Sequence, residues 1–435
     1  MKNKIIIDNF SVLEHIEIDV KNINILIGPQ ASGKSLIAKL VYFFRTIGAN
    51  MSNAILSGGG KRELNNEIRD VFNLIFPDYI MKEAPFQVEY YYHDKESFIK
   101  LSKEKSKSYK SIKIEYSKNI LNEFEKMKRL YKTNTQNKNS TIQDQMSNVS
   151  RYVMDGFQEL INGSKQSYSV FIPAGRSFFA NIEKNIFALI GRSFNIDYSL
   201  TRFGEFLQNL IRESYLRDNP SNYLDRVIYK MCVELLRGEY VYDSQKQLEY
   251  LRTKENKIIS LRDSSSGQQE VAPLVISLMV LAKYFKNSFF MFVEEPETHL
   301  FPASQRTIVE IFAAIYNLFK KNTGYFITTH SPYILTAFNN LLQAENTYRT
   351  IMEKFTANKI DAEKKDEQLK ALDKIVSANK RISFDDVSVH LVKNGKAKNI
   401  ANRENRLIDA NDIDEESNRM ASIFDSLLDI SFGES

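Results

Sequence analysis

The sequence contains a single cysteine among its 435 residues, Cys232. One thiol excludes an internal disulfide framework and a zinc site built from several cysteines. No stretch approaches ~18 uninterrupted apolar residues, the length that a membrane-spanning helix requires. The first residues, MKNKIIIDNF, lead directly into a strand-like run and lack the pattern of a signal peptide. We therefore expect a cytoplasmic protein with no membrane span.

Excess charge of one sign is also scarce. The formal net charge is +5, which is small for this length and neither requires nor excludes contact with nucleic acid. Apolar residues make up 43% of the chain and charged residues 26%, as in soluble globular proteins. The length alone suggests two or three domains around a large core.

The hydrophobic pattern predicts an α/β fold. Three short strands are expected before residue 28, and residues 86–117 predict a small antiparallel sheet. One charged helix is expected over 348–377. The run VSVHLVKNGKAKNI predicts a hairpin, because Asn394–Gly395 suits a type I′ turn. The remaining predicted elements are two helices in 118–163, helices in 177–236, short strands in 238–262 and a final helix at 417–430.

The stretch GPQASGKS, Gly28 to Ser35, matches a phosphate-binding pattern at every fixed position. A strand-like run precedes it and an amphipathic run follows, which argues against a chance glycine-rich turn. Gly28 and Gly33 let backbone N–H groups turn toward phosphate oxygens, and the helix N-terminus adds a favourable dipole. Lys34 is expected to reach the β- and γ-phosphates and the Ser35 hydroxyl to hold Mg²⁺. The predicted nucleotide-binding residues are Gly28, Gln30, Ala31, Ser32, Gly33, Lys34, Ser35 and Leu36.

A second motif, SFFMFVEEPETHLFP, is an apolar strand that ends in two adjacent carboxylates. Such a strand places acidic groups at the carboxyl edge of a parallel sheet, where ligands bind. Glu294 is expected to hold Mg²⁺, directly or through water. Glu295 is expected to polarise the attacking water as general base. The alternative is a solvated charged turn after a core strand, which the glycine-rich loop makes less attractive.

Two further motifs follow the same logic. GYFITTHSPYIL places His330 after another buried strand, where it suits a sensor of the γ-phosphate, although a lone histidine is more often structural. SLRDSSSGQQEVAPLVISLMVL places Ser266 and Gly267 at the start of a long apolar helix, a second anion-binding N-terminus. An ordinary capped helix is the alternative there.

Along the chain these motifs follow one another as glycine-rich loop, SSGQQE, the paired carboxylates and His330. In that order they resemble the motifs of the ABC-type ATPase heads, over nearly the whole chain from Ile5 to about Leu428. SSGQQE, Ser265 to Glu270, is similar to the LSGGQE signature of that family. The resemblance implies ATP and Mg²⁺ as cofactors and hydrolysis of ATP to ADP and phosphate. It also implies that Ser266 and Gly267 act on ATP held by a second copy of the chain, with residues 297–301 crossing the interface between the copies.

The sequence departs from the family pattern at several places. Gln268 replaces the second signature glycine, and Glu294 stands where the family usually has aspartate. The glutamine that normally follows the strand before the helical lobe is not evident. The strand VFIPAGR takes a comparable place and offers Arg176, which is interpreted either as a site residue or as a structural ion-pair partner.

Within the family, the opening strands resemble RecF and SMC heads, whereas EEPETHLFP and THSPYIL resemble stand-alone ATPases of bacterial anti-phage systems. Those include the overcoming-lysogenization-defect nucleases and the PARIS and Septu subunits. Only residues 331–435 follow the switch histidine, too few for the remaining core and a Toprim nuclease domain. Asp409, Asp412 and Asp414 are interpreted as a solvated loop. The insert at 118–163 is too short for a long coiled coil.

The expected organisation has an N-terminal ATPase lobe (1–117), a helical lobe leading to the signature (118–266) and a C-terminal ATPase part (267–435). We expect an ATPase whose catalytic residues are Lys34, Glu295 and His330. Its expected partners are a second copy, a separate effector and a phage trigger protein. A RecF-like ATPase gated by DNA remains an alternative, since residues 103–138 are rich in lysine. A scaffold that barely hydrolyses ATP is a third.

Overall fold

The computed structural model describes most of the chain, and every structural statement below concerns these residues. They are 3–77, 84–93, 96–104, 112–136, 151–157, 159–160, 168–181, 197–208, 226–243, 248–284, 288–319, 322–409, 422–428 and 430–431.

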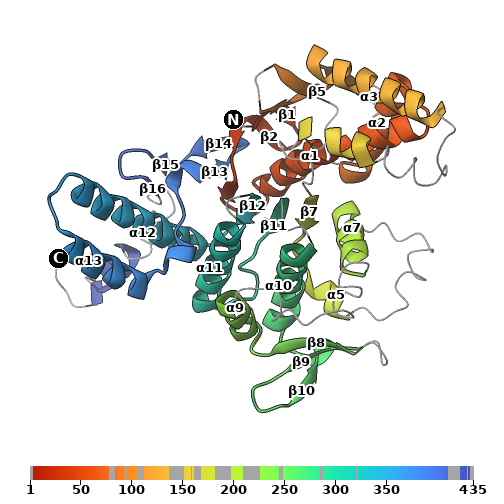
Figure 1. Cartoon of the computed structure of the whole chain (residues 1–435). Coiled ribbons are helices and arrows are strands. Elements are labelled where there is room, and N and C mark those ends of the chain that lie inside the picture. The colour runs from red at the N-terminus through yellow and green to blue at the C-terminus, as the bar shows by residue number, and fades with distance from the viewer. Residues whose placement is uncertain are drawn as a thin grey trace.

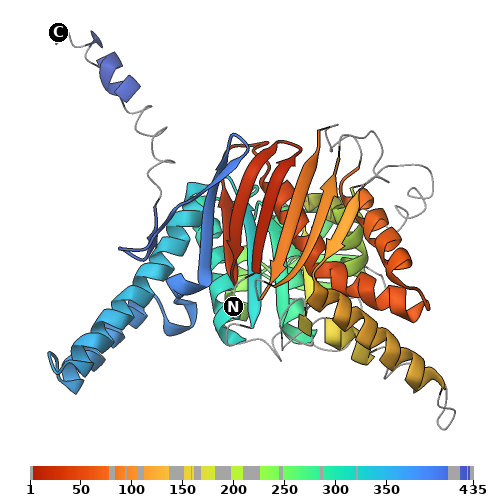
Figure 2. The same ribbon diagram turned by 90° about the horizontal axis from the view of Figure 1, so that it is seen from above.

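One large sheet of eleven strands organises the fold (Figures 1 and 2). Its strands lie in the order β6 (Lys113–Tyr116), β5 (Ser97–Lys103), β4 (Phe86–Tyr92), β1 (Asn3–Phe10), β2 (Leu13–Val20), β14 (Lys396–Asn399), β13 (Val387–Lys393), β3 (Ile23–Ile27), β12 (Thr323–Thr329), β11 (Phe289–Glu294) and β7 (Tyr168–Ile172). From β13 to β7 all neighbours are parallel. From β6 to β2 all neighbours are antiparallel. The predicted α/β class is therefore confirmed.

The antiparallel strands predicted over 86–117 are present, but they do not form a sheet of their own. Strand β4 pairs with β1 along its length, with Val88 opposite Ile7, so these strands extend the main sheet. Figure 2 shows β4 and β5 lying beside β1 and β2 in this way. The sequence pattern predicted these strands, but it carries no information on which strand would pair with β4.

Helices cover both faces of the parallel strands. The helices of the described residues include α1 (Lys34–Leu56), α2 (Lys61–Ile75), α3 (Lys118–Gln136), α5 (Ser177–Asn181), α7 (Tyr198–Phe206), α9 (Arg226–Leu236), α10 (Ser266–Tyr284), α11 (Pro302–Leu318), α12 (Pro332–Thr356) and α13 (Ala362–Ile375). Figure 1 shows α10 and α11 on one side of β11 and β12 and α1 on the other. A separate three-stranded sheet of β8 (Glu239–Asp243), β9 (Leu248–Arg252) and β10 (Ile258–Ser260) confirms the strands expected over 238–262.

Alternate residues of the parallel strands face two different cores. In β11, Phe289, Met291 and Val293 pack in the core under α9 to α12, whereas Phe290 and Phe292 pack in the core under α1 to α3. Strands β3, β11 and β12 are consequently buried along their whole length. Parallel strands covered on both faces read as continuous apolar runs, which explains why their sequences showed no alternation.

The hairpin predicted around Asn394–Gly395 is confirmed. Asn394 and Gly395 have φ of 52° and 72°, as a type I′ turn requires. Strand β13 pairs with β3, and β14 pairs with β2 at Lys396 and His15. The hairpin therefore inserts between β2 and β3, two strands that follow one another in the sequence.

The single helix predicted over 348–377 is wrong. Helix α12 runs to Thr356, and α13 begins again at Ala362. The break has local causes: Asn358 adopts a left-handed backbone (φ 54°), and the Asp361 carboxylate caps α13 by accepting a hydrogen bond from the Lys364 N–H at 2.8 Å. A continuous charged pattern concealed this capping signal.

Near the C-terminus, the described residues 422–428 are helical, in agreement with the predicted final helix. The loop with Asp412 and Asp414 lies outside the described residues, as does the whole segment 137–150 between the two predicted helices. In the part of the chain that the structure describes, no helix is long and apolar enough to cross a membrane.

We predict that His390, on β13, makes the protein less stable in acid. Burial lowers the pKa of this side chain from 6.5 to about 4, against a smaller opposing effect of Asp19. Between these values the unfolded chain binds the extra proton, so stability falls as pH drops from about 6.5 to about 4, by about 3 kcal/mol. The measurement is the free energy of unfolding at several pH values.

The variant His390→Leu is expected to lose that part of the pH dependence, while His15→Gln retains it because His15 is exposed on β2. Equal pH slopes for the native protein and His390→Leu would contradict the prediction.

Candidate nucleotide site

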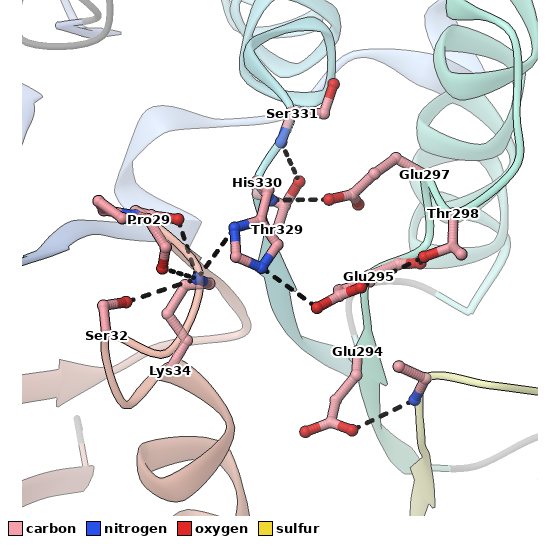
Figure 3. Close-up of polar contacts among 12 residues, drawn as sticks. Pro29, Ser32, Lys34, Glu294, Glu295, Glu297, Thr298, Thr329, His330 and Ser331 are labelled. Carbon is pink, nitrogen blue, oxygen red and sulfur yellow. Dashed lines mark hydrogen bonds and ion pairs between the residues drawn. The ribbon is translucent and has the colours of Figure 1, made fainter. Parts of the chain in front are cut away.

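Three of the four sequence motifs meet where three neighbouring parallel strands end (Figure 3). The glycine-rich loop follows β3, the two carboxylates end β11, and His330 follows β12. The register places Ile27 beside Thr329, and Thr328 beside Glu294. The three segments therefore leave the sheet at the same level and bring their side chains together.

The loop conformation depends on its glycines. A Cβ atom on Gly28 would overlap the carbonyl oxygen of Val392, on β13, and one on Gly33 would overlap the Leu13 side chain. Gly33 also has φ of 98° and caps α1. Ala31 lies between them with φ of 58°, in the left-handed region. Glycine is thus required by close contacts as well as by backbone geometry.

Lys34 is held by the loop itself. Its ammonium donates hydrogen bonds to the carbonyl oxygens of Gly28 and Pro29, at 2.9 and 2.8 Å, and lies 3.4 Å from the Ser32 hydroxyl. Burial lowers the pKa of Lys34, and the charges of Glu295 and Glu297 oppose that effect. The loop is thus closed around a cation that suits phosphate oxygens.

Glu294 is the buried carboxylate of the site. One of its oxygens accepts a hydrogen bond from the Ala174 N–H at 3.2 Å, and the other, Oε1, has no hydrogen-bond partner among the described residues. Burial raises the pKa of Glu294, opposed by the Ser35 hydroxyl and the Lys39 ammonium. A buried carboxylate oxygen without a partner, close to an exposed serine hydroxyl, fits the oxygen ligands that Mg²⁺ prefers.

Glu295 and His330 face one another. The Glu295 Oε1 and His330 Nε2 atoms are 3.1 Å apart, and His330 Nδ1 lies 3.4 Å from the Lys34 ammonium. An ammonium can only donate, so Nδ1 accepts and the ring proton lies on Nε2, directed at Glu295. The two side chains are 35% and 31% exposed, which leaves the carboxylate open to a water molecule.

The backbone around Glu295 is tightly fixed. Its φ of 45° lies in the left-handed region, which costs a residue with a side chain about 1–3 kcal/mol. The Glu295 N–H donates to the Thr328 carbonyl at 2.8 Å. Glu297 accepts a hydrogen bond from the His330 N–H at 2.6 Å, which ties β12 to the loop after β11. These contacts direct the Glu295 side chain toward His330.

The predicted signature residues lie elsewhere. Ser266 and Gly267 begin α10, where Ser266 is exposed and a Cβ on Gly267 would come within 2.9 Å of the His299 carbonyl oxygen. In the described ranges, no hydrogen bond joins Ser266 to the loop of Gly28–Ser35. The structure therefore brings together Lys34, Glu294, Glu295 and His330, and it leaves the signature turn outside this group. Of the other predicted loop residues, Gln30, Ala31 and Ser35 are exposed, and Ser32 and Leu36 are half-buried.

Sequence reasoning gave too little weight to the residues that support the site. Arg176 is completely buried and contacts Glu270, near the start of α10, as well as the backbone at the end of β11. Lys39 pairs with Asp197 at 2.7 Å, and Asp197 caps α7. In the sequence, Arg176 and Lys39 appear only as charged residues within largely apolar stretches. That pattern is too common to identify the partner of either residue.

The fold and the site define a P-loop enzyme that hydrolyses a nucleoside triphosphate. The family model described as "AAA ATPase domain" matches residues 1–335, and the chain belongs to this family. It is therefore an ATPase, as the sequence predicted. No curated protein sequence matches the chain.

Three solved SMC head domains are among the similar structures. The SmcHead bound to the C-winged helix domain of ScpA is 10% identical, with 92% of this chain and 96% of that chain covered and a TM-score of 0.41. The SMC head domain from Thermotoga maritima is 11% identical, with 77% and 91% covered and a TM-score of 0.35. The head with an extended coiled coil bound to the C-terminal domain of ScpA, derived from Pyrococcus furiosus, is 10% identical, with 92% and 95% covered and a TM-score of 0.38. These weak similarities add nothing to the family match.

We predict that Gly28→Ala abolishes ATP binding. The added methyl group would overlap the Val392 carbonyl oxygen, so the loop must move away from β13. Gly58→Ala is the matched control, because Gly58 also has a positive φ (77°) and nothing lies within 4 Å of its added carbon. The control is expected to lower the melting temperature and keep native affinity for ATP in a titration. Native affinity in Gly28→Ala would refute the prediction.

Proposed function

We propose that the protein is an ABC-type ATPase whose complete sites form between two copies of the chain. The observation that carries this proposal is the separation of the signature turn from the nucleotide loop. Ser266 is exposed and makes no hydrogen bond to the Gly28–Ser35 loop among the described residues. An exposed helix N-terminus with serine and glycine suits a phosphate group presented by another molecule.

Within one copy, Gly28 to Ser35 enclose the triphosphate and Lys34 exchanges its bonds to loop carbonyls for bonds to phosphate oxygens. Ser35 and Glu294 supply the oxygen ligands for Mg²⁺, which neutralises phosphate charge when bound. These roles rest on the closed loop and on the partnerless oxygen of Glu294.

Glu295 serves as the general base in this proposal. It is the partly exposed carboxylate, and the Nε2–H of His330 orients it at 3.1 Å. His330 also contacts Lys34, so it is placed to respond when Lys34 turns toward a γ-phosphate. A base and a phosphate sensor are thereby joined in one short hydrogen-bonded chain.

We expect Glu295→Gln to reduce ATP turnover by about 10²–10⁴-fold, because general-base catalysis contributes on that order. ATP binding should persist, so the variant should accumulate as an ATP-bound pair whose native mass can be measured. Unchanged turnover would contradict the assignment of the base. A monomer in saturating ATP would contradict the paired site.

A mixing experiment tests the paired site directly. Lys34→Ala removes the nucleotide loop and keeps the signature turn, whereas Ser266→Arg blocks the turn and keeps the loop. Each variant is expected to be inactive alone, and activity should return on mixing because one complete site forms in a mixed pair. The control mixes Lys34→Ala with Glu295→Gln, whose defects fall on the same half of the site. Recovery in the control, or none in the test mixture, would refute the proposal.

We further propose that this ATPase controls a separate effector, a nuclease or a toxin, in anti-phage defence. The support is the resemblance of EEPETHLFP and THSPYIL to stand-alone defence ATPases. Purification of Glu295→Gln protein together with the products of neighbouring genes should yield a second polypeptide in ATP. The exposed residues Lys126 and Arg129 on α3 favour a second candidate, a DNA-gated ATPase. Turnover that rises strongly with plain DNA would support that candidate.

A further inference from the structure

Arg176 lies at the centre of a buried hydrogen-bond network beside the nucleotide site. It follows β7 and is fully excluded from solvent. One guanidinium nitrogen, Nη1, donates to the carbonyl oxygens of Pro173 and Glu294, at 3.1 and 2.6 Å. The other, Nη2, donates to the Glu295 carbonyl oxygen at 3.0 Å. Arg176 thus holds the backbone of both carboxylates of the site.

The same side chain holds the N-terminal part of α10 at Glu270. Its Nε donates to the Glu270 carbonyl oxygen at 3.1 Å, and its Nη2 lies 3.4 Å from Glu270 Oε1. The Glu270 carboxylate accepts two further bonds, from the N–H groups of Arg176 and Ser177 at 3.0 and 2.8 Å. Glu270 is 1% exposed and stands three residues after Gly267. The helix turn that carries the signature is therefore bonded to Arg176 through both its backbone and a side chain.

The contact at Glu295 matters because that residue has a strained backbone. Its φ of 45° must be maintained by its surroundings. Its carbonyl oxygen accepts from Arg176 Nη2, from the Thr298 N–H at 3.1 Å and from the Thr298 hydroxyl at 3.0 Å. Without the bond from Arg176, only Thr298 would hold this carbonyl oxygen among the contacts described.

We propose that Arg176 is a positioning residue that couples the signature turn of α10 to the catalytic carboxylate of the same chain. Engagement of Ser266 and Gly267 with nucleotide on a second copy shifts the N-terminal part of α10, including Glu270, and Arg176 transmits that shift to Glu295. Each copy then hydrolyses its own ATP about 10- to 100-fold faster when its own signature turn is occupied, so the mixed pair of Lys34→Ala and Ser266→Arg recovers only part of the native turnover. The inference rests on the paired site proposed above and deepens it.

The geometry suits this role because a guanidinium is planar and rigid. Its donors point in fixed directions, so a displacement at Glu270 cannot be absorbed by rotation of a single terminal group, as it could in a lysine. No more than one side chain separates α10 from the Glu295 backbone. Misplacement of a reacting group by about 1 Å can lower a rate by about 100-fold, so a small shift is sufficient for control.

The test compares Arg176→Lys with Arg381→Lys, a second buried arginine, which pairs with Asp373 away from the site. ATP affinity, ATP-dependent native mass and turnover per site are measured over a range of protein concentrations. In the native protein, turnover per site should rise as pairs form. In Arg176→Lys, ATP affinity and pairing should persist, while kcat falls about 10- to 100-fold and the rise of turnover with concentration shrinks by the same factor. Arg381→Lys should behave as the native protein.

A double variant keeps the test valid if Arg176→Lys does not fold. Arg176→Gln with Glu270→Gln removes both buried charges together, so neither is left unpaired. It is expected to bind ATP and to pair, with the same reduction of kcat and a correspondingly smaller rise of turnover with concentration. KM should stay within about twofold of the native value, because the nucleotide loop is untouched.

Two results would overturn the coupling. One is a folded, pairing variant whose turnover rises with concentration as in the native protein. The other is a variant that loses ATP binding, pairing and total turnover to the same extent, while its folded fraction keeps the native turnover per site. That result would assign Arg176 a purely structural role. Failure of the paired site is recognised separately, from native protein that stays monomeric with constant turnover per site. That result, which needs only the native protein, would refute the coupling as well.

Discussion

The parallel register of β3, β12 and β11 is the constraint on which the site depends. Because these strands are hydrogen-bonded side by side and end at one level, the glycine-rich loop, His330 and the two glutamates leave the sheet together. Burial on both faces fixes that register, since a shift by one residue would exchange the faces of Phe290 and Met291 between two cores. The chemistry is thus positioned by apolar side chains that take no part in it.

The site keeps charged groups in surroundings that disfavour charge. Lys34 and Glu294 are buried, and burial lowers the pKa of Lys34 and raises the pKa of Glu294, because it disfavours the charged form of each. Hydrogen bonds that Lys34 donates to the loop carbonyls and that Glu294 accepts from the Ala174 N–H offset part of this cost. The remainder is available to be relieved by a ligand of opposite charge, which is the usual logic of a prearranged phosphate and cation site.

The motifs that act through local backbone geometry could be recognised in the sequence. The loop from Gly28 to Ser35, the carboxylates Glu294 and Glu295, and the Asn394–Gly395 turn each depend on residues adjacent in the chain. The two interpretations of Arg176 could not be told apart, because its partners Glu270, Glu294 and Glu295 lie 94, 118 and 119 positions away. For the same reason the pattern could not show that β4 pairs with β1. The break between α12 and α13 was missed because helical charge periodicity continues through Asn358 and Asp361.

The hairpin of β13 and β14 has a consequence for how the protein is made. Strands β2 and β3 adjoin in the sequence, yet this hairpin separates them in the sheet, and its Val392 carbonyl abuts Gly28. A nascent chain leaving the ribosome therefore exposes the β3 edge until residue 399 has been synthesised. Contacts of such long sequence separation close slowly, and an open strand edge invites pairing with other chains. The protein thus has an interval during translation in which a chaperone that covers strand β3 would increase the yield of folded enzyme.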